Sequence, residues 1–317
     1  MSRLAPYLAK RFLFLFITLL GASFIVFMII HLLPGDPARI LAGPEATQQE
    51  VEALRHRLGL DKPLVVQYAE FMARILRGDF GKSIVTGKPI SALIEYRFVN
   101  TLKLSIVGIL LSMIIGIPLG ILAALHRNSR IDQLVMGFAV IGVSTPIFVI
   151  AIFLMLVFSV KLHLLPATSV TGEITLRHLI LPGLALALYG AAPIARMTRA
   201  SMVEVLGKEY IKVAFSFGLP RRIVIYKYAL KNALIPVVTV TGLIFGYMLA
   251  GAVITETVFS YPGLGRLLID AIFSRDYPLI QIGILFIAAT FALVNTAVDI
   301  LYMVIDPRLR SPRGETA

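Results

Sequence analysis

The sequence predicts an all-helical integral membrane protein with six membrane-spanning helices. Of the 317 residues, 58% are hydrophobic and only 15% are charged, whereas soluble domains carry about 25% charged residues. The hydrophobic residues gather in six charge-free runs near the ~20 residues that a helix needs to cross a bilayer. None shows the polar stripe of a buried soluble helix. The runs are 12–30, 104–125, 133–160, 179–195, 232–255 and 277–298.

The distribution of positive charge predicts which segments face the cytoplasm. If the N-terminus lies inside and the spans alternate, the inside segments are 1–11, 126–132, 196–235 and 306–317. They hold 16 Lys and Arg residues against five acidic residues, whereas the outside segments hold 14 against 12. Because short cytoplasmic loops are enriched in Lys and Arg, we expect both termini in the cytoplasm. The net charge of +12 therefore indicates orientation in a lipid bilayer, with no nucleic acid partner.

Four segments follow from this topology. Residues 1–33 form a cytoplasmic tail and the first span, whose apolar run is too long for a cleaved signal peptide. Residues 34–100 form an external segment that we expect to pack on the outer mouth of the bundle. The remaining spans occupy 101–305, and 306–317 form a cytoplasmic tail.

Local signals predict two helices in the external segment. Thr47 and Glu50 have capping-box spacing, which predicts a helix that ends near Leu58, before Gly59. A second helix is expected over 65–76.

Prolines predict bends in two spans. Pro118 lies in the second run, and Ser144, Thr145 and Pro146 lie in the third. A proline removes one helical hydrogen bond and kinks the helix. The kinks suit a bundle that lines or gates a path, and equally suit packing between neighbouring helices.

Small residues follow one face of the fifth run. They recur at helical spacing, which favours close helix packing over pore lining. They are Gly242, Gly246, Ala250 and Gly251.

No motif indicates catalysis, a metal site or nucleotide binding by this chain. Residues 78–83 read GDFGKS, but a phosphate-binding loop needs four residues between its first Gly and Gly-Lys, and here there are two. The five histidines never recur at i, i+3 or i, i+4, and the chain has no cysteine. No serine has a neighbouring His–acid pair. We therefore expect no cofactor in this chain.

Two acidic residues lie at the ends of spans. Asp299 follows the last run, and either pairs with an arginine or takes part in transport. Glu256 ends the fifth run on the outside, where solvation at the interface is the simplest interpretation. Together with Ser144, Thr145 and Pro146, they are candidate residues of a pathway or gate.

Residues 196–235 form a basic 40-residue segment between two spans. Apolar residues with steps of 3, 4, 3 and 4 predict one helix over 202–217, with a favourable pair between Glu204 and Lys208. Gly218 is expected to end this helix, and Pro220 to begin a second one that leads to Pro236. The result is a helical hairpin that either docks on a partner or lies on anionic lipid. The apolar residues are Val203, Leu206, Tyr210, Val213 and Phe217.

This segment resembles the cytoplasmic loop of permease subunits in ATP-binding-cassette (ABC) importers, whose core is Glu-Ala-Ala-x-x-x-Gly. Ala214 and Gly218 match the core, whereas Lys212 and Val213 replace its Glu and first Ala, and the following Leu-Pro is displaced to 235–236. Further segments resemble the dipeptide, oligopeptide, nickel and glutathione permeases, the first dipeptide permease subunit in particular. They are HLLPGDP at 31–37, LGLDKP at 58–63, GIPLGILAA at 116–124, STPIF at 144–148, ARMTRASMVEVLG at 195–207, LKNALIPVVT at 230–239, AGAVITETVFSYPGLGRLLIDAI at 250–272, RDYP at 275–278 and DPRLR at 306–310.

The resemblance implies the type I ABC importer permease fold and a division of labour in the bacterial inner membrane. A second homologous permease would complete the pathway, two ATP-binding subunits would hold ATP and Mg, and a periplasmic or lipid-anchored binding protein would deliver di- or oligopeptides. The hairpin would be the coupling helix that enters an ATPase. Its residues would be Glu209, Lys212, Ala214, Gly218, Leu219 and Pro220.

Two other functions remain as rivals. An ion-coupled secondary transporter would need ionisable residues at the membrane midplane and often an inverted repeat. A membrane-embedded hydrolase would need paired catalytic groups within the spans. We find neither feature in the sequence.

Overall fold

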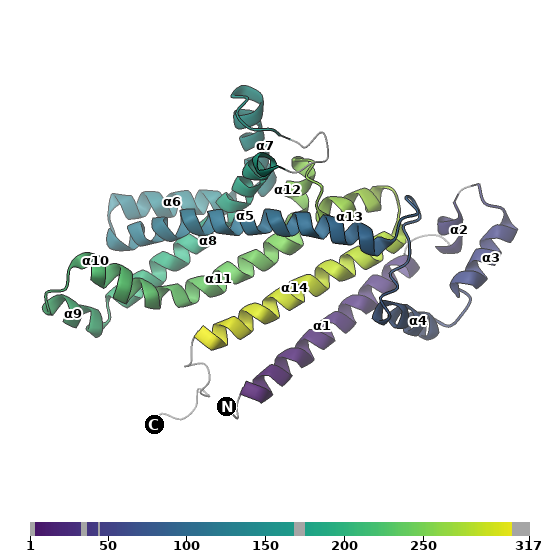
Figure 1. Cartoon of the computed structure of the whole chain (residues 1–317), viewed down its shortest axis with the longest axis horizontal. Helices are drawn as coiled ribbons and strands as arrows, with labels where there is room; N and C mark the ends of the chain where they lie inside the picture. Colours follow the sequence, from purple (N-terminus) through teal and green to yellow (C-terminus); the bar gives the residue numbers. More distant parts are fainter. Residues whose placement is uncertain (1–3, 33–36, 44, 168–174, 306–317) are drawn as a thin grey trace.

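The computed structural model describes residues 4–32, 37–43, 45–167 and 175–305, which form a bundle of long helices (Figure 1). Among them, five helices are long and apolar enough to cross a membrane, and a bent pair brings the number to six when it is counted as one span. The predicted all-α membrane fold with six spans is therefore confirmed. The five are α1 (Leu4–Leu32), α5 (Ile90–Leu125), α8 (Leu176–Leu206), α11 (Leu230–Gly251) and α14 (Tyr277–Ile305), with α11 extended backwards by α10 (Arg221–Ile223) and η2 (Val224–Ala229).

The bent pair corresponds to the third apolar run. Helix α6 (Arg130–Ser144) is followed by α7 (Ile147–Leu154) and η1 (Met155–Lys161), which turn away by 101° (Figure 1). Pro146 caps α7, and Thr145 before it is extended, with φ −82° and ψ 124°. A residue before proline is pushed out of the helical region, so the sequence breaks the span here. The expected kink is a complete break.

Pro118 behaves differently. It lies inside α5, which continues through it without interruption for 36 residues, or about 54 Å at 1.5 Å per residue. That length exceeds the ~30 Å of hydrocarbon in a bilayer. Helix α5 begins at Ile90, so the sequence-based boundary at residue 100 falls inside it.

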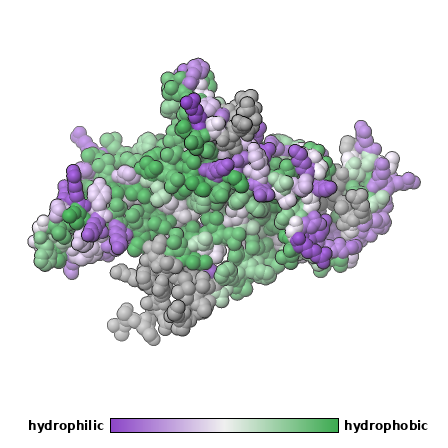
Figure 2. All heavy atoms as spheres, viewed as in Figure 1, coloured by the Kyte–Doolittle hydropathy of each residue, from purple (hydrophilic) through white to green (hydrophobic). Residues whose placement is uncertain are grey.

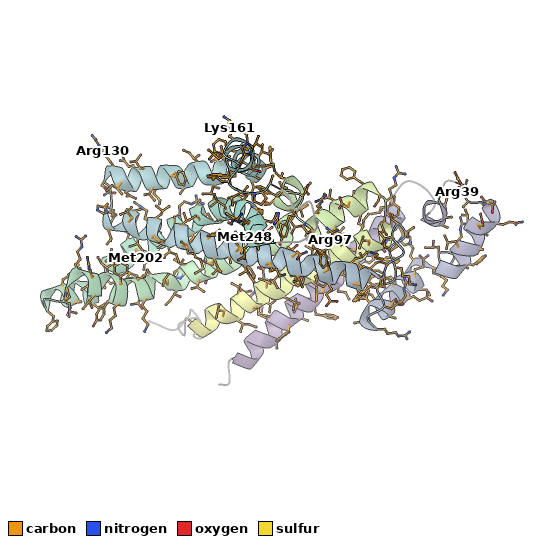
Figure 3. All side chains as sticks on the ribbon, turned by 45° about the horizontal axis from the view of Figure 1, so that its top comes forward. Arg39, Arg97, Arg130, Lys161, Met202 and Met248 are labelled. Atoms are coloured by element: carbon orange, nitrogen blue, oxygen red, sulfur yellow. The ribbon has the colours of Figure 1, made fainter. Side chains whose placement is uncertain are left out.

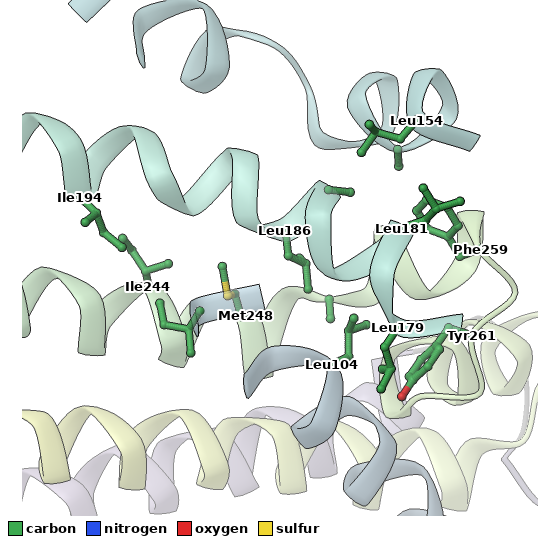
Figure 4. Close-up of a cluster of buried hydrophobic side chains, with 14 of the residues drawn as sticks. Leu104, Leu154, Leu179, Leu181, Leu186, Ile194, Ile244, Met248, Phe259 and Tyr261 are labelled. Carbon is green, nitrogen blue, oxygen red and sulfur yellow. The ribbon is translucent and has the colours of Figure 1, made fainter. Parts of the chain in front are cut away.

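Close packing joins α5 to α8. A Cβ on Gly120 would lie 2.6 Å from the carbonyl oxygen of Ala195, and one on Gly116 would lie 2.7 Å from that of Ala191. Small residues let helices approach closely in lipid. The core beside this contact is apolar, and Figure 4 shows side chains from α5, α8 and α11 meeting in it. They include Leu104, Leu181, Leu186, Ile194, Ile244 and Met248.

The glycines of α11 pack against α14. Positions for a Cβ on Gly242 and Gly246 lie against Val298 and Asn295 respectively. This confirms the packing interpretation for these two glycines. The side chains at positions 250 and 251 lie outside the described ones.

Three short helices connect α1 to α5 at one end of the bundle: α2 (Pro37–Ala42), α3 (Gln48–Leu58) and α4 (Leu64–Leu76) (Figure 1). The predicted capping box of α3 is confirmed, because the Glu50 amide donates to Thr47 Oγ1 and the Thr47 amide donates to Glu50. Gly59 ends α3 with φ 67°. Helix α4 packs on α1 through a hydrogen bond of 2.7 Å between Ser23 and Tyr68.

The surface has the pattern of a membrane protein. Hydrophobic residues cover the middle of the visible face, and hydrophilic residues gather at its two ends (Figure 2). Along α1, large apolar side chains such as Phe12, Phe16 and Ile25 are exposed. Such a continuous apolar belt needs lipid or a partner to cover it.

The connections divide the molecule into two ends. One end carries the turn between α5 and α6 together with α9 (Glu209–Ser216) and α10, and we call it the basic end; the other carries α2–α4 and α13 (Leu264–Phe273) (Figure 1). The start of α1 and the end of α14 lie toward the basic end. The structure therefore gathers the predicted cytoplasmic segments that it describes on one side.

Candidate functional site

The basic segment folds as a helical hairpin at the basic end. Helix α8 ends at Leu206, Lys208 is extended with φ −69° and ψ 149°, and α9 then begins. The prediction of one helix over 202–217 is therefore wrong, because the chain turns at Gly207 and Lys208. The predicted pair is confirmed, since Lys208 Nζ lies 2.9 Å from Glu204 Oε1.

One face of α9 packs inside the hairpin. Ile211 and Ala214 are buried there, Ala214 with 7% of its surface exposed. Ala214, one of the predicted coupling residues, therefore contacts the hairpin's own core. That core joins α9 to the end of α5, the end of α8 and the start of α11. Its buried members are Ile121, Ala124, Met202, Ile211, Ala214, Val224, Ile225, Ala229 and Ala233.

An exposed stripe of α9 beside this buried face is apolar. Tyr210, Val213 and Phe217 all lie on it, and Phe217 is 81% exposed. These are three of the five residues of the predicted stripe, while Val203 and Leu206 pack against the hairpin core. We call Tyr210, Val213, Phe217 and Gly218 the docking face. Exposed apolar clusters of this kind mark interaction sites.

The hairpin turns at Gly218. This residue has φ 74°, and its amide donates to the carbonyl of Phe215 at 2.9 Å. A Cβ placed on Gly218 would meet no atom within 4 Å, so the space beside the turn is open. Leu219 packs against the hairpin core, and Pro220 caps α10 one position before the expected first helical residue.

Two charged residues of the predicted coupling set lie on the exposed part of α9. Glu209 occupies its first turn, where a negative charge complements the helix dipole. Lys212 is exposed one turn later. The structure therefore brings the predicted coupling residues into one hairpin, with Ala214 and Leu219 facing inward.

The candidate gate residues of α6 and α7 lie at the 101° break. Ser144 and Pro146 are exposed, and Thr145 Oγ1 donates to the carbonyl of Ile141 at 2.8 Å. Thr145 also lines an apolar cavity of about 360 Å³ between α6 and α7 on one side and α5 and α8 on the other. These residues are placed at a bend beside empty volume, and their role in a pathway stays a prediction.

Glu256 is not solvated at an interface, so that interpretation is wrong. Its exposed surface is 0%. The carboxylate accepts hydrogen bonds from Thr101 Oγ1 at 2.6 Å and from the Arg266 amide at 3.1 Å, and Thr101 in turn accepts from the Leu264 amide. Burial raises the pKa of the Glu256 carboxyl, while these hydrogen bonds oppose the shift. Glu256 thus fixes α12 (Val253–Val258) to α5 and to the start of α13.

Asp299 forms an ion pair with Arg11, which joins the end of α14 to the start of α1. Both side chains are partly exposed. This geometry supports the interpretation that Asp299 pairs with an arginine, and the partner lies on α1.

A further ion pair at the basic end, which the sequence did not predict, joins α8 to α6. Arg199 of α8 binds both carboxylate oxygens of Asp132 in the first turn of α6, at 2.5 and 2.6 Å. Asp132 is only 4% exposed. The available signal was Asp132 itself, an acidic residue in a short loop that is otherwise basic.

The glycine-rich segment rejected as a phosphate loop has a structural partner. Ser83 Oγ donates to Asp276 Oδ2 at 2.5 Å, and the Ile84 amide donates to the other oxygen at 3.3 Å. Asp276 is buried between α13 and α14. The segment therefore holds the chain before α5 against the α13–α14 turn.

Comparison with known proteins identifies the family. Residues 116–311 match the family "Binding-protein-dependent transport system inner membrane component", and residues 4–105 match the N-terminal component of such systems. The chain is 46% identical over 304 residues to the "Glutathione transport system permease protein GsiC" of Shigella flexneri serotype 5b, covering 96% of this chain and 98% of that protein. The GsiC of Escherichia coli K12 is 45% identical over the same length and coverage.

Solved structures agree in fold. A structure of the MetNI methionine ABC transporter in an inward-facing conformation matches with a TM-score of 0.59 and 17% identity, covering 69% of this chain and 99% of that chain. Another crystal form of the same transporter gives a TM-score of 0.57. At this identity the likeness concerns the fold alone.

These matches confirm the resemblance that the sequence motifs indicated, and they argue against the ion-coupled carrier and the hydrolase. The chain, with its six spans and its hairpin between α8 and α11, belongs to the binding-protein-dependent transport system inner membrane component family and is a permease subunit of an ABC importer.

Proposed function

We propose that this chain forms half of the translocation pathway of a bacterial importer for short peptides, and that its docking face inserts into a cytoplasmic ATPase subunit. The single observation that carries the docking claim is the docking face, an apolar surface at the tip of a folded hairpin with open space beside Gly218. Lipid could cover an apolar helix face, but the tip lies at a hydrophilic end of the molecule (Figure 2).

The orientation follows from charge. The segments that the structure gathers at the basic end carry most of the 16 Lys and Arg residues assigned to the inside. Short loops rich in Lys and Arg stay in the cytoplasm. The hairpin and both termini thus face the compartment where ATP is available.

The proposed assembly has several subunits. A second, homologous permease completes the pathway, and two ATP-binding subunits hold ATP and Mg and hydrolyse the nucleotide. A periplasmic or lipid-anchored binding protein delivers the substrate. The family name supports the last partner, because it describes systems that depend on a binding protein.

The packing suits transmission of force. The hairpin core ties α9 to the ends of α5, α8 and α11, and glycines hold α5 against α8. When an ATPase subunit pulls on the docking face, these helices move together as one body. Rigid-body displacement of this kind is a common way to convert a local change into a global one.

The substrate class rests on the relatives. They are named as glutathione permeases, and glutathione is a short peptide. We therefore place glutathione and other di- or tripeptides first among the substrates of this chain.

The test is reconstitution in proteoliposomes with a second permease, the ATPase subunits and a binding protein of the same transport system. We expect ATP-dependent uptake of labelled glutathione or dipeptides. Phe217→Asp should abolish binding of the ATPase subunits and reduce uptake at least tenfold, because it places a charge in an apolar contact.

A matched control is available at the opposite end. Phe273 on α13 is 84% exposed, close to the 81% of Phe217, so Phe273→Asp makes the same chemical change away from the hairpin. Uptake should persist in this variant. Normal ATPase binding by Phe217→Asp would overturn the docking claim, and uptake without ATP would overturn the importer.

A further inference from the structure

The Asp132–Arg199 ion pair links the start of α6 to α8 with a fixed geometry, and we call this pair the joint. Arg199 Nε lies 2.5 Å from Asp132 Oδ1 and Nη2 lies 2.6 Å from Oδ2, a bidentate arrangement that fixes angle as well as distance. The Asn128 amide also donates to Oδ2 at 3.0 Å. One carboxylate therefore holds the α5–α6 turn, the first turn of α6 and α8 together.

Arg199 moves with the hairpin. It lies on α8 seven residues before the helix ends at Leu206, and Met202, one turn further on, is buried in the hairpin core. Figure 3 shows Met202 at the base of the hairpin and Arg130, the first residue of α6, at the same end of the molecule. Helix α8 is also held against α5 at Gly116 and Gly120. A displacement of the hairpin therefore displaces the Arg199 guanidinium.

Beyond its first turn, α6 is held by apolar packing along one face, and Gly142 near its end lies against Leu188 and Ala192 of α8. Of its 15 residues, only Asp132 and Ala139 are buried. An apolar cavity of about 360 Å³ is lined by residues of α5, α6, α7 and α8, and the 101° break lies beside it. The helix thus has a charged attachment at its start, apolar contacts beside a cavity along its length and a break at its end.

We propose that the Asp132–Arg199 pair transmits the displacement of the hairpin to α6, so that α6 and α7 swing about this joint into the neighbouring cavity. The proposal rests on the proposed coupling role of the hairpin. Asp132 and Arg199 are then positioning residues that act through α6. Breaking a buried pair leaves an uncompensated charge and is costly, so the joint stays closed while the weaker contacts of α6 change.

The experiment uses spin labels, which the absence of cysteine makes simple. Leu134 on α6 and Tyr189 on α8 are both exposed, and Leu134→Cys with Tyr189→Cys places one label on each side of the joint. Pulsed electron resonance then gives the distance distribution in the full complex without nucleotide and with trapped ATP. We expect two distinct distances that depend on nucleotide.

Arg199→Ala should broaden this distribution and remove its dependence on nucleotide. ATP hydrolysis should continue while uptake falls at least tenfold. The exchange of charges in Asp132→Arg with Arg199→Asp should restore a large part of both signals, which guards against a variant that merely fails to fold. The control is Arg11→Ala, which removes a different ion pair, the one with Asp299, and should leave the α6–α8 distances unchanged.

Two outcomes separate this proposal from the proposed function. If the labelled wild-type chain does not bind the ATPases, the docking claim for the hairpin fails. The lone chain in nanodiscs still tests the joint, because Arg199→Ala should broaden its distance distribution. If Arg199→Ala lowers the melting temperature but leaves the distance distribution and its nucleotide response intact, the pair is only a stabilising contact and the joint is overturned.

Discussion

The two ends of the bundle hold their connecting segments by different interactions. At the opposite end, Glu256, Thr101 and the amides of Leu264 and Arg266 form a buried hydrogen-bonded group. At the basic end, the hairpin is held by an apolar core and leaves its docking face exposed. The first arrangement is complete within the chain, whereas the second presents an apolar surface at a hydrophilic end.

Exposure of a single aromatic residue does not make the difference. Phe273 at the opposite end is as exposed as Phe217. What distinguishes the hairpin is the combination of three exposed apolar residues on one helix face with open space at Gly218. The Glu256 group uses its hydrogen bonds within the chain, whereas the proposed coupling hairpin leaves an apolar surface uncovered.

The largest expected effect on stability concerns Glu256, which anchors α12 to α5 and α13. Glu256→Ala removes the acceptor for the Thr101 hydroxyl and the Arg266 amide. Each buried donor left unpaired costs about 1–3 kcal/mol, so we expect a loss of several kcal/mol in stability. Thermal unfolding in detergent measures it.

Glu256→Gln is the matched variant. It keeps an acceptor oxygen. Because burial raises the pKa of Glu256, the site disfavours a charged side chain and accepts the neutral glutamine. We expect a much smaller decrease in melting temperature than for Glu256→Ala. Equal decreases would contradict the hydrogen-bonded anchor.

The next effect separates the two faces of α9. Ala214→Asp puts a carboxyl into the hairpin core, and a buried polar group without a partner costs at least ~1–3 kcal/mol. Its neighbour Val213 is exposed, so Val213→Asp should keep the melting temperature and still weaken ATPase binding. Unfolding and co-purification of the ATPase measure the two effects. If both variants behave alike, the assignment of the faces is wrong.

The smallest effect on stability concerns the tip. Gly218 has φ 74° with no atom near its Cβ position, so Gly218→Ala should cost only the ~1–2 kcal/mol of a left-handed conformation. Gly218→Trp should cost about the same in the free chain, since the added ring points into open space.

Function should distinguish these two tip variants. Gly218→Trp fills the space that the partner needs, and uptake should fall further than in Gly218→Ala while ATP hydrolysis by the complex persists. Equal uptake by both variants would show that the partner does not approach Gly218.

Local features of the fold were predictable from the sequence. The apolar runs gave the spans, because the hydrocarbon thickness fixes the length of a helix that crosses it. In the Thr47–Glu50 cap and in the Glu204–Lys208 pair, the two partners are at most four residues apart, and both interactions form as predicted. Pro146 marked the position of the break, although its size of 101° depends on how α7 packs.

Features that join distant residues could not be predicted. Thr101 and Glu256 lie 155 positions apart, and Asp132 and Arg199 lie 67 apart, so no local pattern links them. The period of α9 gave an apolar stripe, but only the packing of α8 and α11 decided that Ile211 and Ala214 face inward and Phe217 outward.

The sequence by itself determined the membrane class, the six spans, the basic hairpin and, through its motifs, the family. Each depends on composition or on short-range periodicity, because the hydrocarbon thickness and the 3.6-residue helix turn act on residues that are close in the sequence. The tertiary structure alone decided that Glu256 is an internal anchor, that Asp132 holds α6 to α8 and which face of the hairpin is free. Burial and charge pairing depend on which helices become neighbours, and that choice is made by the packing of the whole bundle.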